Sequence, residues 1–412
     1  MAADLAAEGL SMRPRVLVST DIGGTDPDDF QSMVHLLLYA DVLDLEGLIS
    51  SPYGDGRVAD IHSVIDAYEH DLPSLRRHSE QYPSAARLRS IVRQGALTSA
   101  PPAGHDRPTE GSDWIIRCAN AVDHRRLDVL IWGGIDDLAQ ALHDDPQIAE
   151  RIRVHYIGGP NKMWSVDSYH YLQAEHPDLM MIESNSTYRG FFAENDSDGP
   201  DNERFVAEHV AGHGALGELF ADHLPSLKMG DSPTVGWLLH GPRDPAEPSW
   251  GGRFIPVWPG RTSTIHGLPS AAVQVETYSV VELILPVPVG YGPADVSRLI
   301  IDGRVGGPSP VGVPVGDGLR FRFSPRDPKV ISIDVESSHP DLNGSTGAVT
   351  ACGPADERWH RPDRRHPNWW SDDQDPAVAI DGWPGAASIS RWRDDYLADF
   401  ARRLDRCLDV LA

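Results

Sequence analysis

The sequence is poor in cysteine and in basic residues, and it has no long hydrophobic run. Its 412 residues include 3 cysteines and 36 lysines and arginines against 61 aspartates and glutamates, so the formal net charge is −25. Three widely spaced cysteines provide neither a disulfide framework nor a zinc-binding pattern. The acidic balance argues against a nucleic-acid polymer or an anionic membrane as a partner, and it suits a protein that binds cations. No segment approaches the roughly 18 apolar residues that a transmembrane helix requires.

The N-terminal segment "MAADLAAEGLSMRPR" contains no continuous apolar stretch. We therefore expect no secretory signal and a cytoplasmic protein. Hydrophobic residues make up 40% of the chain, which is enough for a substantial core, and the length suits two ordinary domains or one large domain with insertions. A homo-oligomer is compatible with these numbers, but nothing in the sequence specifies one.

Strand-like and helix-like segments alternate over the first part of the chain, residues 14–260. The apolar runs that predict strands lie at 16–20, 43–51, 127–134, 152–159 and 178–185. The alternation predicts an α/β domain with a mostly parallel central sheet and flanking helices. In such sheets ligands bind at the carboxyl ends of the strands, where this sequence places polar residues and glycines.

Residues 261–355 have a different pattern, with short β-type runs separated by glycine and proline and no helical period. This predicts an inserted, sandwich-like all-β module. We expect its few aromatic residues, such as Phe321 and Phe323, to be core rather than a sugar-binding platform. The chain then returns to the α/β domain at 356–412 and ends in an amphipathic helix.

Four aspartates are concentrated in the segment "STDIGGTDPDD". Asp21 follows the first predicted strand, and Asp26, Asp28 and Asp29 stand at the start of the next predicted helix, with Pro27 in its first turn. One interpretation is an acidic helix cap, in which Asp26 is the N-cap and the following acids favour the helix dipole. That interpretation does not explain Asp21, because a charge at a buried strand end is costly unless it is paired or bound to a metal.

Two other interpretations take the segment as a ligand site. The letters "DIGGT" resemble the phosphate-binding turn of sugar kinases of the actin-like superfamily, but a helix follows here instead of the second strand of a hairpin. The alternative is a divalent-cation site, because hard oxygen ligands at a strand end and an adjoining helix start suit Ca²⁺. So many like charges cannot all stay ionised without a cation or raised pKa values.

The segment also resembles the N-terminal aspartate motif of nucleoside hydrolases. More closely, the chain resembles the nucleoside hydrolase-like family often labelled cellulose-binding, which is related to calcium-dependent inosine-uridine-preferring nucleoside hydrolases. The segments that carry the resemblance are "STDIGGTDPDDFQSMVHLLLYAD", "EGLISSPYGDGR", "IWGGIDDLAQAL", "IESNSTYRGFF", "WLLHGPRDPAEPSWGGRF" and "SRWRDDYLADFARRLD". Together they span most of residues 15–258 and 369–410.

The resemblance implies a calcium site. Asp21 matches the aspartate that binds Ca²⁺ and activates a water, and Asp29 matches a further ligand. The loop that contains Ile135 falls where a backbone carbonyl completes the calcium shell. In "LLHGPRDP", His240 is the best match for the acid that protonates the leaving group, and Asp244 for a metal aspartate.

The resemblance also implies a sugar site. Asp28 matches the residue that holds ribose hydroxyls, and Glu183 with Asn185 matches a Glu-x-Asn pair that grips the sugar. Asp55 stands where nucleoside hydrolases place a sugar-binding asparagine. Trp250 is expected either at the mouth of the substrate site or in the packing of the closing segment.

The sequence departs from the family pattern at three places, one of which is position 55, where Asp stands instead of Asn. Three extra residues lie between Asp21 and the Asp28–Asp29 pair, so Asp26 is a second candidate for the role given to Asp21. His240 and Asp244 are four residues apart instead of adjacent.

The resemblance implies a Ca²⁺-dependent glycoside hydrolase of the N-ribosyl type, in which a metal-activated water attacks a sugar anomeric carbon with inversion. The alternative is a non-catalytic carbohydrate-binding protein on the same scaffold. In both cases the expected partner is a small sugar or nucleoside-like molecule, and the sequence identifies neither the sugar nor the leaving group.

Overall fold

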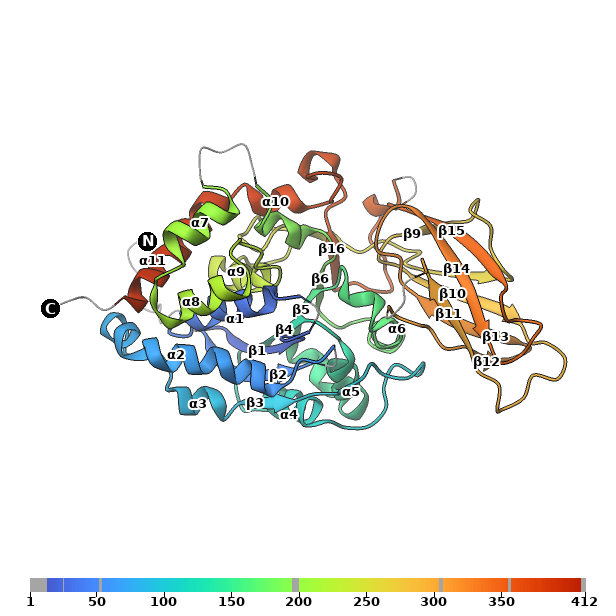
Figure 1. Ribbon diagram of the computed structural model, residues 1–412, viewed down its shortest axis with the longest axis horizontal. Helices are drawn as coiled ribbons and strands as arrows, with labels where there is room; N and C mark the ends of the chain where they lie inside the picture. Colours follow the sequence, from blue (N-terminus) through green and yellow to red (C-terminus); the bar gives the residue numbers. More distant parts are fainter. Residues whose placement is uncertain are drawn as a thin grey trace.

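The structure, a computed structural model, describes residues 13–24, 26–51, 54–194, 200–303, 307–354 and 357–408. Figure 1 shows an α/β domain and, beside it, a separate module built of β-strands. One eight-stranded sheet forms the centre of the α/β domain, and two four-stranded sheets form the module. The predicted fold class, an α/β protein with a mostly parallel sheet and an inserted all-β module, is confirmed.

The central sheet has the strand order β3-β2-β1-β4-β5-β6-β16-β7. Its strands are β1 (Arg15–Thr20), β2 (Asp44–Ser50), β3 (Val92–Gln94), β4 (Leu127–Trp132), β5 (Ile152–Ile157), β6 (Met181–Ser184), β7 (Phe254–Pro256) and β16 (Trp369–Asp372). Neighbouring strands are parallel except for the pair β16–β7. Because helices cover both faces, β1 and β4 are buried along their whole length; β4 is mostly apolar, and β1 is apolar at its centre, residues 16–18.

Alternate side chains of β1 enter two different cores. Val16 and Val18 pack with residues of α1, α2, α8, α9 and α11, whereas Leu17 packs with residues of α4, α5 and α6. The helices of the first group are α1 (Asp28–Leu38), α2 (Val58–His78), α8 (Gly214–His223), α9 (Ser232–His240) and α11 (Arg393–Leu404). Those of the second are α4 (Glu110–Ala119), α5 (Asp136–Asp144) and α6 (Val166–Glu175). The remaining α-helices are α3 (Ala85–Arg89), α7 (Asn202–His209) and α10 (Ala386–Ser390).

The structure corrects the sequence analysis at short elements and at one helix start. Strands β3, β7 and β16 have only three or four residues, too few to show a period in the sequence. The polar segment around Trp369 forms β16, and Trp369 is buried. Helix α1 begins at Asp28 with Pro27 at the N-cap position, so Asp26 lies one residue before the cap.

The β module consists of two sheets with a common apolar core. One sheet has the order β12-β13-β10-β8 and the other β11-β14-β15-β9. The strands are β8 (Thr262–His266), β9 (Gln274–Glu276), β10 (Val280–Pro286), β11 (Ser297–Ile301), β12 (Val313–Val315), β13 (Gly318–Phe323), β14 (Val330–Ser337) and β15 (Thr346–Cys352). Phe321 and Phe323 lie in the core between the sheets, as expected. The precise domain boundaries at 260/261 and 355/356 stay a prediction.

Arg322 of β13 fixes the module to the α/β domain. Its guanidinium donates to Asp167 Oδ1 of α6 and to the backbone oxygen of Pro102, both at 3.0 Å. The turn that follows β13 is thereby held close to the carboxyl end of the central sheet. None of the described helices is both long enough and apolar enough to cross a membrane.

Candidate functional site

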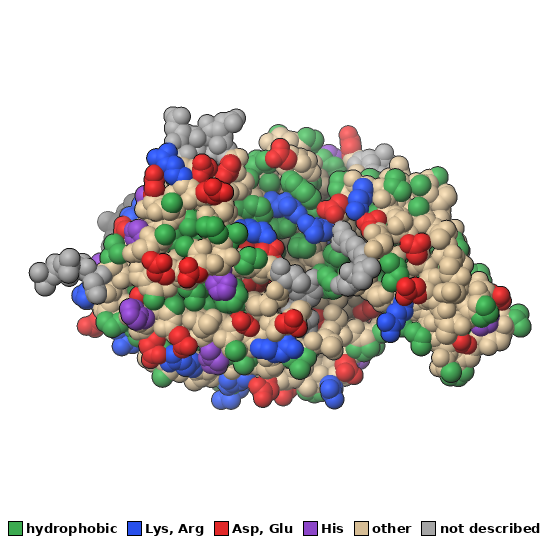
Figure 2. Space-filling view, viewed as in Figure 1, with side chains coloured by type: hydrophobic (Ala, Val, Ile, Leu, Met, Phe, Trp, Pro, Cys, Tyr) green, Lys and Arg blue, Asp and Glu red, His purple; other side chains and the backbone are tan. Residues whose placement is uncertain are grey.

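A cavity of about 360 Å³ opens at the carboxyl end of the central sheet. Trp132 and Ile157, the last residues of β4 and β5, form part of its wall, as does Asp21 directly after β1. The volume falls within the range of small-molecule sites. Figure 2 shows a hollow between the α/β domain and the β module where acidic, basic and hydrophobic side chains meet. The charged residues that line the cavity are Asp21, Asp26, Asp28, Asp29, Arg189, Lys228, Asp231 and Arg326.

Three buried aspartates converge in this cavity. Oxygen atoms of Asp28, Asp29 and Asp231 all lie within 4.8 Å of one another, an arrangement that could hold a metal ion. Asp28 and Asp29 are the first residues of α1, and Asp231 directly precedes α9. Asp21, also buried, lines the same cavity. A strand end and two helix starts therefore bring carboxylates to one place.

Two glycines allow this close approach. A Cβ atom on Gly230 would lie 2.2 Å from Asp28 Oδ2, and one on Gly133 would lie 2.7 Å from Asp21 Cβ. A side chain at either position would push a carboxylate out of place. The hydroxyl of Thr20 donates a hydrogen bond to Asp29 and fixes its orientation.

The electrostatics of the cluster are unfavourable without a cation. Burial, and after it the neighbouring carboxylates, raises the pKa values of Asp28, Asp29 and Asp231 well above the usual range. Burial also raises the pKa of Asp21 to about 7. Because buried like charges cannot all ionise together, the site favours either bound protons or a bound cation. A donor set of carboxylate oxygens alone suits a hard divalent cation such as Ca²⁺ or Mg²⁺.

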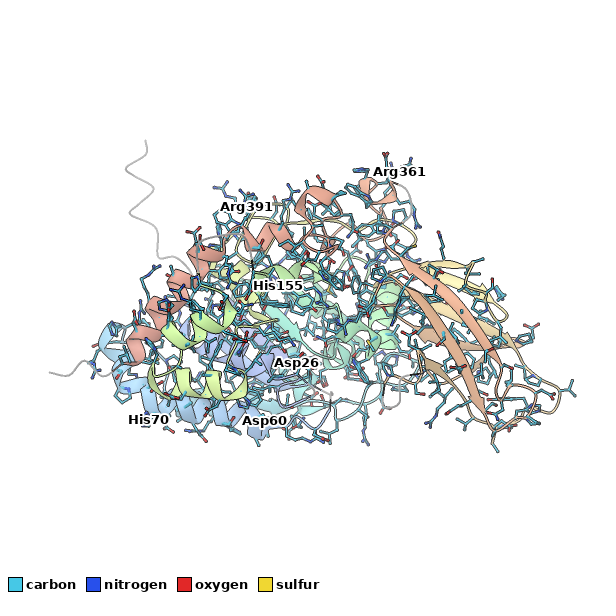
Figure 3. The ribbon with its side chains drawn as sticks, turned by 45° about the horizontal axis from the view of Figure 1, so that its top comes forward. Asp26, Asp60, His70, His155, Arg361 and Arg391 are labelled. Atoms are coloured by element: carbon cyan, nitrogen blue, oxygen red, sulfur yellow. The ribbon has the colours of Figure 1, made fainter. Side chains whose placement is uncertain are left out.

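Asp26 differs from the other aspartates of the cavity because it forms an ion pair with Lys228. Burial alone would raise the pKa of Asp26, but hydrogen bonds from Asp28 and Lys228 outweigh this effect and lower it. Figure 3 shows Asp26 near the centre of the molecule, whereas Asp60 and His70 on α2 lie at its lower edge. The pairing with Lys228 favours Asp21 over Asp26 as the carboxylate free to act on a ligand.

The structure does not bring His240 and Asp244 to the cavity. Asp231 stands at the beginning of α9 and His240 at its end, and a helix of nine residues is roughly 13 Å long. His240 packs against Trp250 and Trp392, with ring centroids 5.8 and 5.1 Å away, and Asp244 is exposed. Asp231 therefore takes the place expected of Asp244. A signal was present in the sequence: Asp231 precedes a serine, a proline and an apolar helix, much as Asp26 precedes Pro27 and α1.

Glu183 is buried in an ion-pair network at the junction of the two domains. Its carboxylate accepts hydrogen bonds from Lys162 at 2.7 Å, Tyr169 at 2.8 Å and Arg261 at 2.8 Å. Burial alone would raise the pKa of Glu183, but Lys162 and Arg261 lower it to about 2. Glu183 does not line the cavity, so the structure gives it a role in joining the domains instead of gripping a sugar.

Asn185, two residues on, is also buried outside the cavity. Its amide donates to Ser371 Oγ at 3.2 Å, and its backbone nitrogen donates to Asp372 Oδ1 at 3.0 Å. These bonds hold the end of β6 against β16. The expected sugar contact of Asn185 is therefore not supported by its position.

Three further expected site residues lie elsewhere. Asp55 is exposed in the turn before α2. The carbonyl of Ile135 accepts the hydrogen bond of Ala139 N at 3.0 Å and so begins α5. Trp250 packs against Gly236 of α9, which agrees with the packing interpretation. None of these three lines the cavity.

Sequence reasoning missed much of the cavity wall. Trp164, Tyr188, Phe192, Arg189 and Arg326 line it beside the aspartates. Burial raises the pKa of Tyr188 to about 12, so its hydroxyl stays protonated. The residues of "STYRGFF" carried the family resemblance without being assigned a role, and nothing in the sequence linked Arg326 to a site some 300 residues before it.

Comparisons with solved structures identify the type of fold. A nucleoside hydrolase-related hypothetical protein from Saccharophagus degradans, associated with carbohydrate metabolism, has a TM-score of 0.51 and 20% identity, over 83% of this chain and 100% of that chain. An inosine-uridine preferring nucleoside hydrolase from Bacillus anthracis has a TM-score of 0.39 and 13% identity, over 86% and 99%. The likeness to the Saccharophagus degradans protein shows that the fold is nucleoside hydrolase-like. No curated protein matches the sequence.

A family match places the chain more specifically. The family described as cellulose-binding Sde182, nucleoside hydrolase-like domain, matches residues 15–254, more than half of the chain. The protein belongs to this family, as the sequence resemblance predicted. The match covers the aspartate cluster and stops before the β module.

Proposed function

We propose that this protein is a divalent-cation-dependent glycoside hydrolase, with Ca²⁺ as the preferred ion and an N-ribosyl-type bond as its target. The observation that carries the proposal is the convergence of Asp21, Asp28, Asp29 and Asp231 in one cavity of nucleoside or sugar size. The family, nucleoside hydrolase-like by its description, supports the same reaction class.

The residues present fit the cation. Asp28, Asp29 and Asp231 would hold it, because their oxygens already lie within 4.8 Å of one another and no lysine or arginine of the described residues forms an ion pair with them. When bound, such a cation supplies Lewis-acid activation of a water and a template for sugar hydroxyls.

The protein's own side chains would perform the remaining work. Asp21, on the cavity wall beside the cluster, accepts the proton of the attacking water. Asp28 orients a sugar hydroxyl, and the nearby carboxylates stabilise positive charge that develops on the anomeric carbon. Trp164 and Tyr188 provide apolar surface that positions the ring of the substrate and excludes water. Direct attack by water gives inversion at the anomeric carbon.

The leaving group would be protonated by a group other than histidine. The described residues of the cavity wall include no histidine, and His240 lies at the far end of α9. Tyr188 and Lys228 both line the cavity and are protonated at neutral pH. Tyr188 and Lys228 are therefore the candidates for the group that donates a proton to the leaving group.

A carbohydrate-binding protein without turnover is the second candidate, favoured by the family's description as cellulose-binding. The two functions differ in what they require of Asp21. Binding through the cation needs only the ligand set, whereas hydrolysis also needs a base beside it.

The test is release of reducing sugar from a panel of nucleosides and aryl ribosides. Calcium-loaded wild type is compared with chelated protein, Asp21→Asn, and Asp244→Asn as a matched exposed control. We expect turnover in the calcium-loaded wild type and the control, and its loss in the other two samples. Sugar binding without turnover would support the carbohydrate-binding alternative, and equal activity after chelation would contradict the cation requirement.

A further inference from the structure

The cavity has a basic part that the proposed reaction does not use. Arg189 and Arg326 line it together with the aspartate cluster. Tyr188 lies between the two: a Cβ on Gly230 would lie 3.9 Å from Tyr188 Cδ2 and 2.2 Å from Asp28, while the Arg189 guanidinium lies 5.3 Å from the Tyr188 ring centroid. One ligand could therefore reach both the acidic and the basic parts.

Among the residues that the structure describes, the side chain of Arg189 has no hydrogen-bond acceptor. Its guanidinium stacks on Trp383 at 3.8 Å, and its Nε is buried without a hydrogen-bond partner. Within the described part of the chain, no carboxylate forms an ion pair with it. A guanidinium carries five N–H donors in a planar fork, and stacking on an aromatic ring holds that fork in one orientation.

Three of the four buried arginines among the described residues are paired with a carboxylate, and the fourth, Arg393, donates to the neutral acceptors Pro200 O and Asn202 Oδ1. Arg15, Arg261 and Arg322 each have a carboxylate oxygen at 2.6, 2.8 and 3.0 Å, respectively. Acidic residues greatly outnumber basic ones in the chain, so carboxylate partners are plentiful. Arg189 differs from all four, because among the described residues it has neither a carboxylate nor a neutral acceptor, and it lines a ligand-sized cavity. It is therefore available to bind an anionic group of a ligand.

Arg326 comes to the cavity from the β module. It lies in the turn between β13 and β14, close after Arg322, which fixes the module to α6. It forms an ion pair with its own neighbour Asp327 at 3.5 Å, and its Nε makes no hydrogen bond to a described residue. Lys228, the third basic residue of the wall, is already paired with Asp26.

We propose that Arg189 and Arg326 bind an oxyanion of the ligand, so that the substrate is a sugar derivative bearing a phosphate or a carboxylate. This inference rests on the proposed function of the cavity and names its substrate class. It also gives the β module a role in specificity, since the module supplies one of the two guanidinium groups. Guanidinium forks match phosphate and carboxylate oxygens in a bidentate manner.

The test is calorimetric binding to the calcium-loaded full-length protein of ligand pairs that differ only in charge. Ribose 5-phosphate is compared with ribose, and glucuronate with glucose, so that the two pairs distinguish phosphate from carboxylate. We expect the anionic member of at least one pair to bind about tenfold more tightly or better. Arg189→Gln and Arg326→Gln should each reduce this anionic-to-neutral ratio about tenfold, while Arg298→Gln, an exposed arginine on β11, should preserve it.

Circular dichroism of each variant shows that the comparison is made on folded protein, and Arg189→Lys and Arg326→Lys serve as milder replacements. An anionic-to-neutral ratio near one in both pairs, or a ratio unchanged in both the glutamine and the lysine variants, would overturn the inference. Different results would contradict the proposed function and the present inference. Loss of calcium binding with the anion preference intact would overturn the cation site alone, whereas calcium-dependent cleavage of neutral nucleosides with no anion preference would overturn this inference alone.

Discussion

Two groups of buried carboxylates in the α/β domain have opposite electrostatic character. In the cavity, Asp28, Asp29 and Asp231 lie together and burial raises their pKa values well above the usual range. At the domain junction, Glu183 is equally buried, but Lys162 and Arg261 lower its pKa to about 2. Burial is common to both groups, and the presence of a cationic side chain decides the difference. Glu183 forms ion pairs with two cationic side chains, whereas among the described residues no lysine or arginine forms an ion pair with Asp28, Asp29 or Asp231, which makes the cluster the candidate for binding a cation.

Removing the junction carboxylate should have the largest effect on stability. Glu183→Ala leaves Lys162 and Arg261 buried without their shared partner, and breaking a buried ion pair costs about 3–5 kcal/mol. Urea denaturation measures the change in free energy of unfolding. Glu336→Ala, an exposed glutamate of β14, is the control and should change it by less than about 0.5 kcal/mol. An equally small effect at Glu183 would remove the contrast between the two groups.

The pH dependence of stability should distinguish the two groups by sign. In the metal-free protein, acids with raised pKa values bind more protons folded than unfolded, so stability should fall as pH rises toward and through 7, the pKa of Asp21. Each such proton contributes a slope of up to about 1.4 kcal/mol per pH unit. Glu183 acts oppositely: its contribution is present above pH 4.5 and is lost as the pH falls toward 2. Thermal unfolding in chelator between pH 4 and 8 measures the first slope, and saturating Ca²⁺ should flatten it. A metal-free protein whose stability rises from pH 5 to 8 would contradict this account.

Asp231→Asn tests the difference between the cavity aspartates and Glu183 directly. We expect it to stabilise the metal-free protein, whereas Glu183→Ala should destabilise it. Removing one of several buried like charges should stabilise the chelated protein by about 1 kcal/mol, because repulsion within the cluster decreases. Asparagine is also well tolerated directly before a helix, so the substitution itself should not disturb α9. The melting temperature in chelator measures the change. Asp244→Asn, in an exposed position, should leave it unchanged, and destabilisation by Asp231→Asn would show that Asp231 is structural.

Gly230→Ala should have the smallest effect on the fold and a selective effect on the site. The new Cβ would lie 2.2 Å from Asp28 Oδ2 and would displace that carboxylate from the cluster. We expect calcium affinity to fall severalfold with about 1 kcal/mol of lost stability, the lower end of the cost of inserting a methyl group into a packed site. Gly353→Ala, where a Cβ meets nothing within 4 Å, is the control for both measurements. Equal calcium affinity in the two variants would argue against Asp28 as a ligand.

The sequence was informative where the site lies in one short segment. That Asp21, Asp28 and Asp29 lie close together could be predicted because a strand end and a helix start are adjacent in the chain. Asp231 lies some 200 residues later, and only the packing of α9 against α1 brings it to the cluster. Spacing along the chain explains why His240 and Asp244 do not line the cavity: His240 ends α9 and Asp244 lies beyond it, whereas Asp231 precedes the start of α9.

Glu183 shows a different limit of sequence reasoning. The Glu-x-Asn motif is present in the chain, yet its meaning depends on Lys162 and Arg261, which come from other segments and leave Glu183 no free oxygen. Periodicity identified the fold class, the main parallel strands and the β module. The short strands β3, β7 and β16 depend on pairing with neighbours and not on a pattern of their own.

The most direct test of the central claim is a calorimetric titration of Ca²⁺ into chelator-treated wild type and Asp231→Asn. We predict one calcium ion bound per wild-type chain and greatly weakened binding in the variant, because the cluster of Asp28, Asp29 and Asp231 forms the site. Absence of binding to the wild type, or equal binding to both proteins, would contradict the assignment of this cavity as a cation-dependent active site.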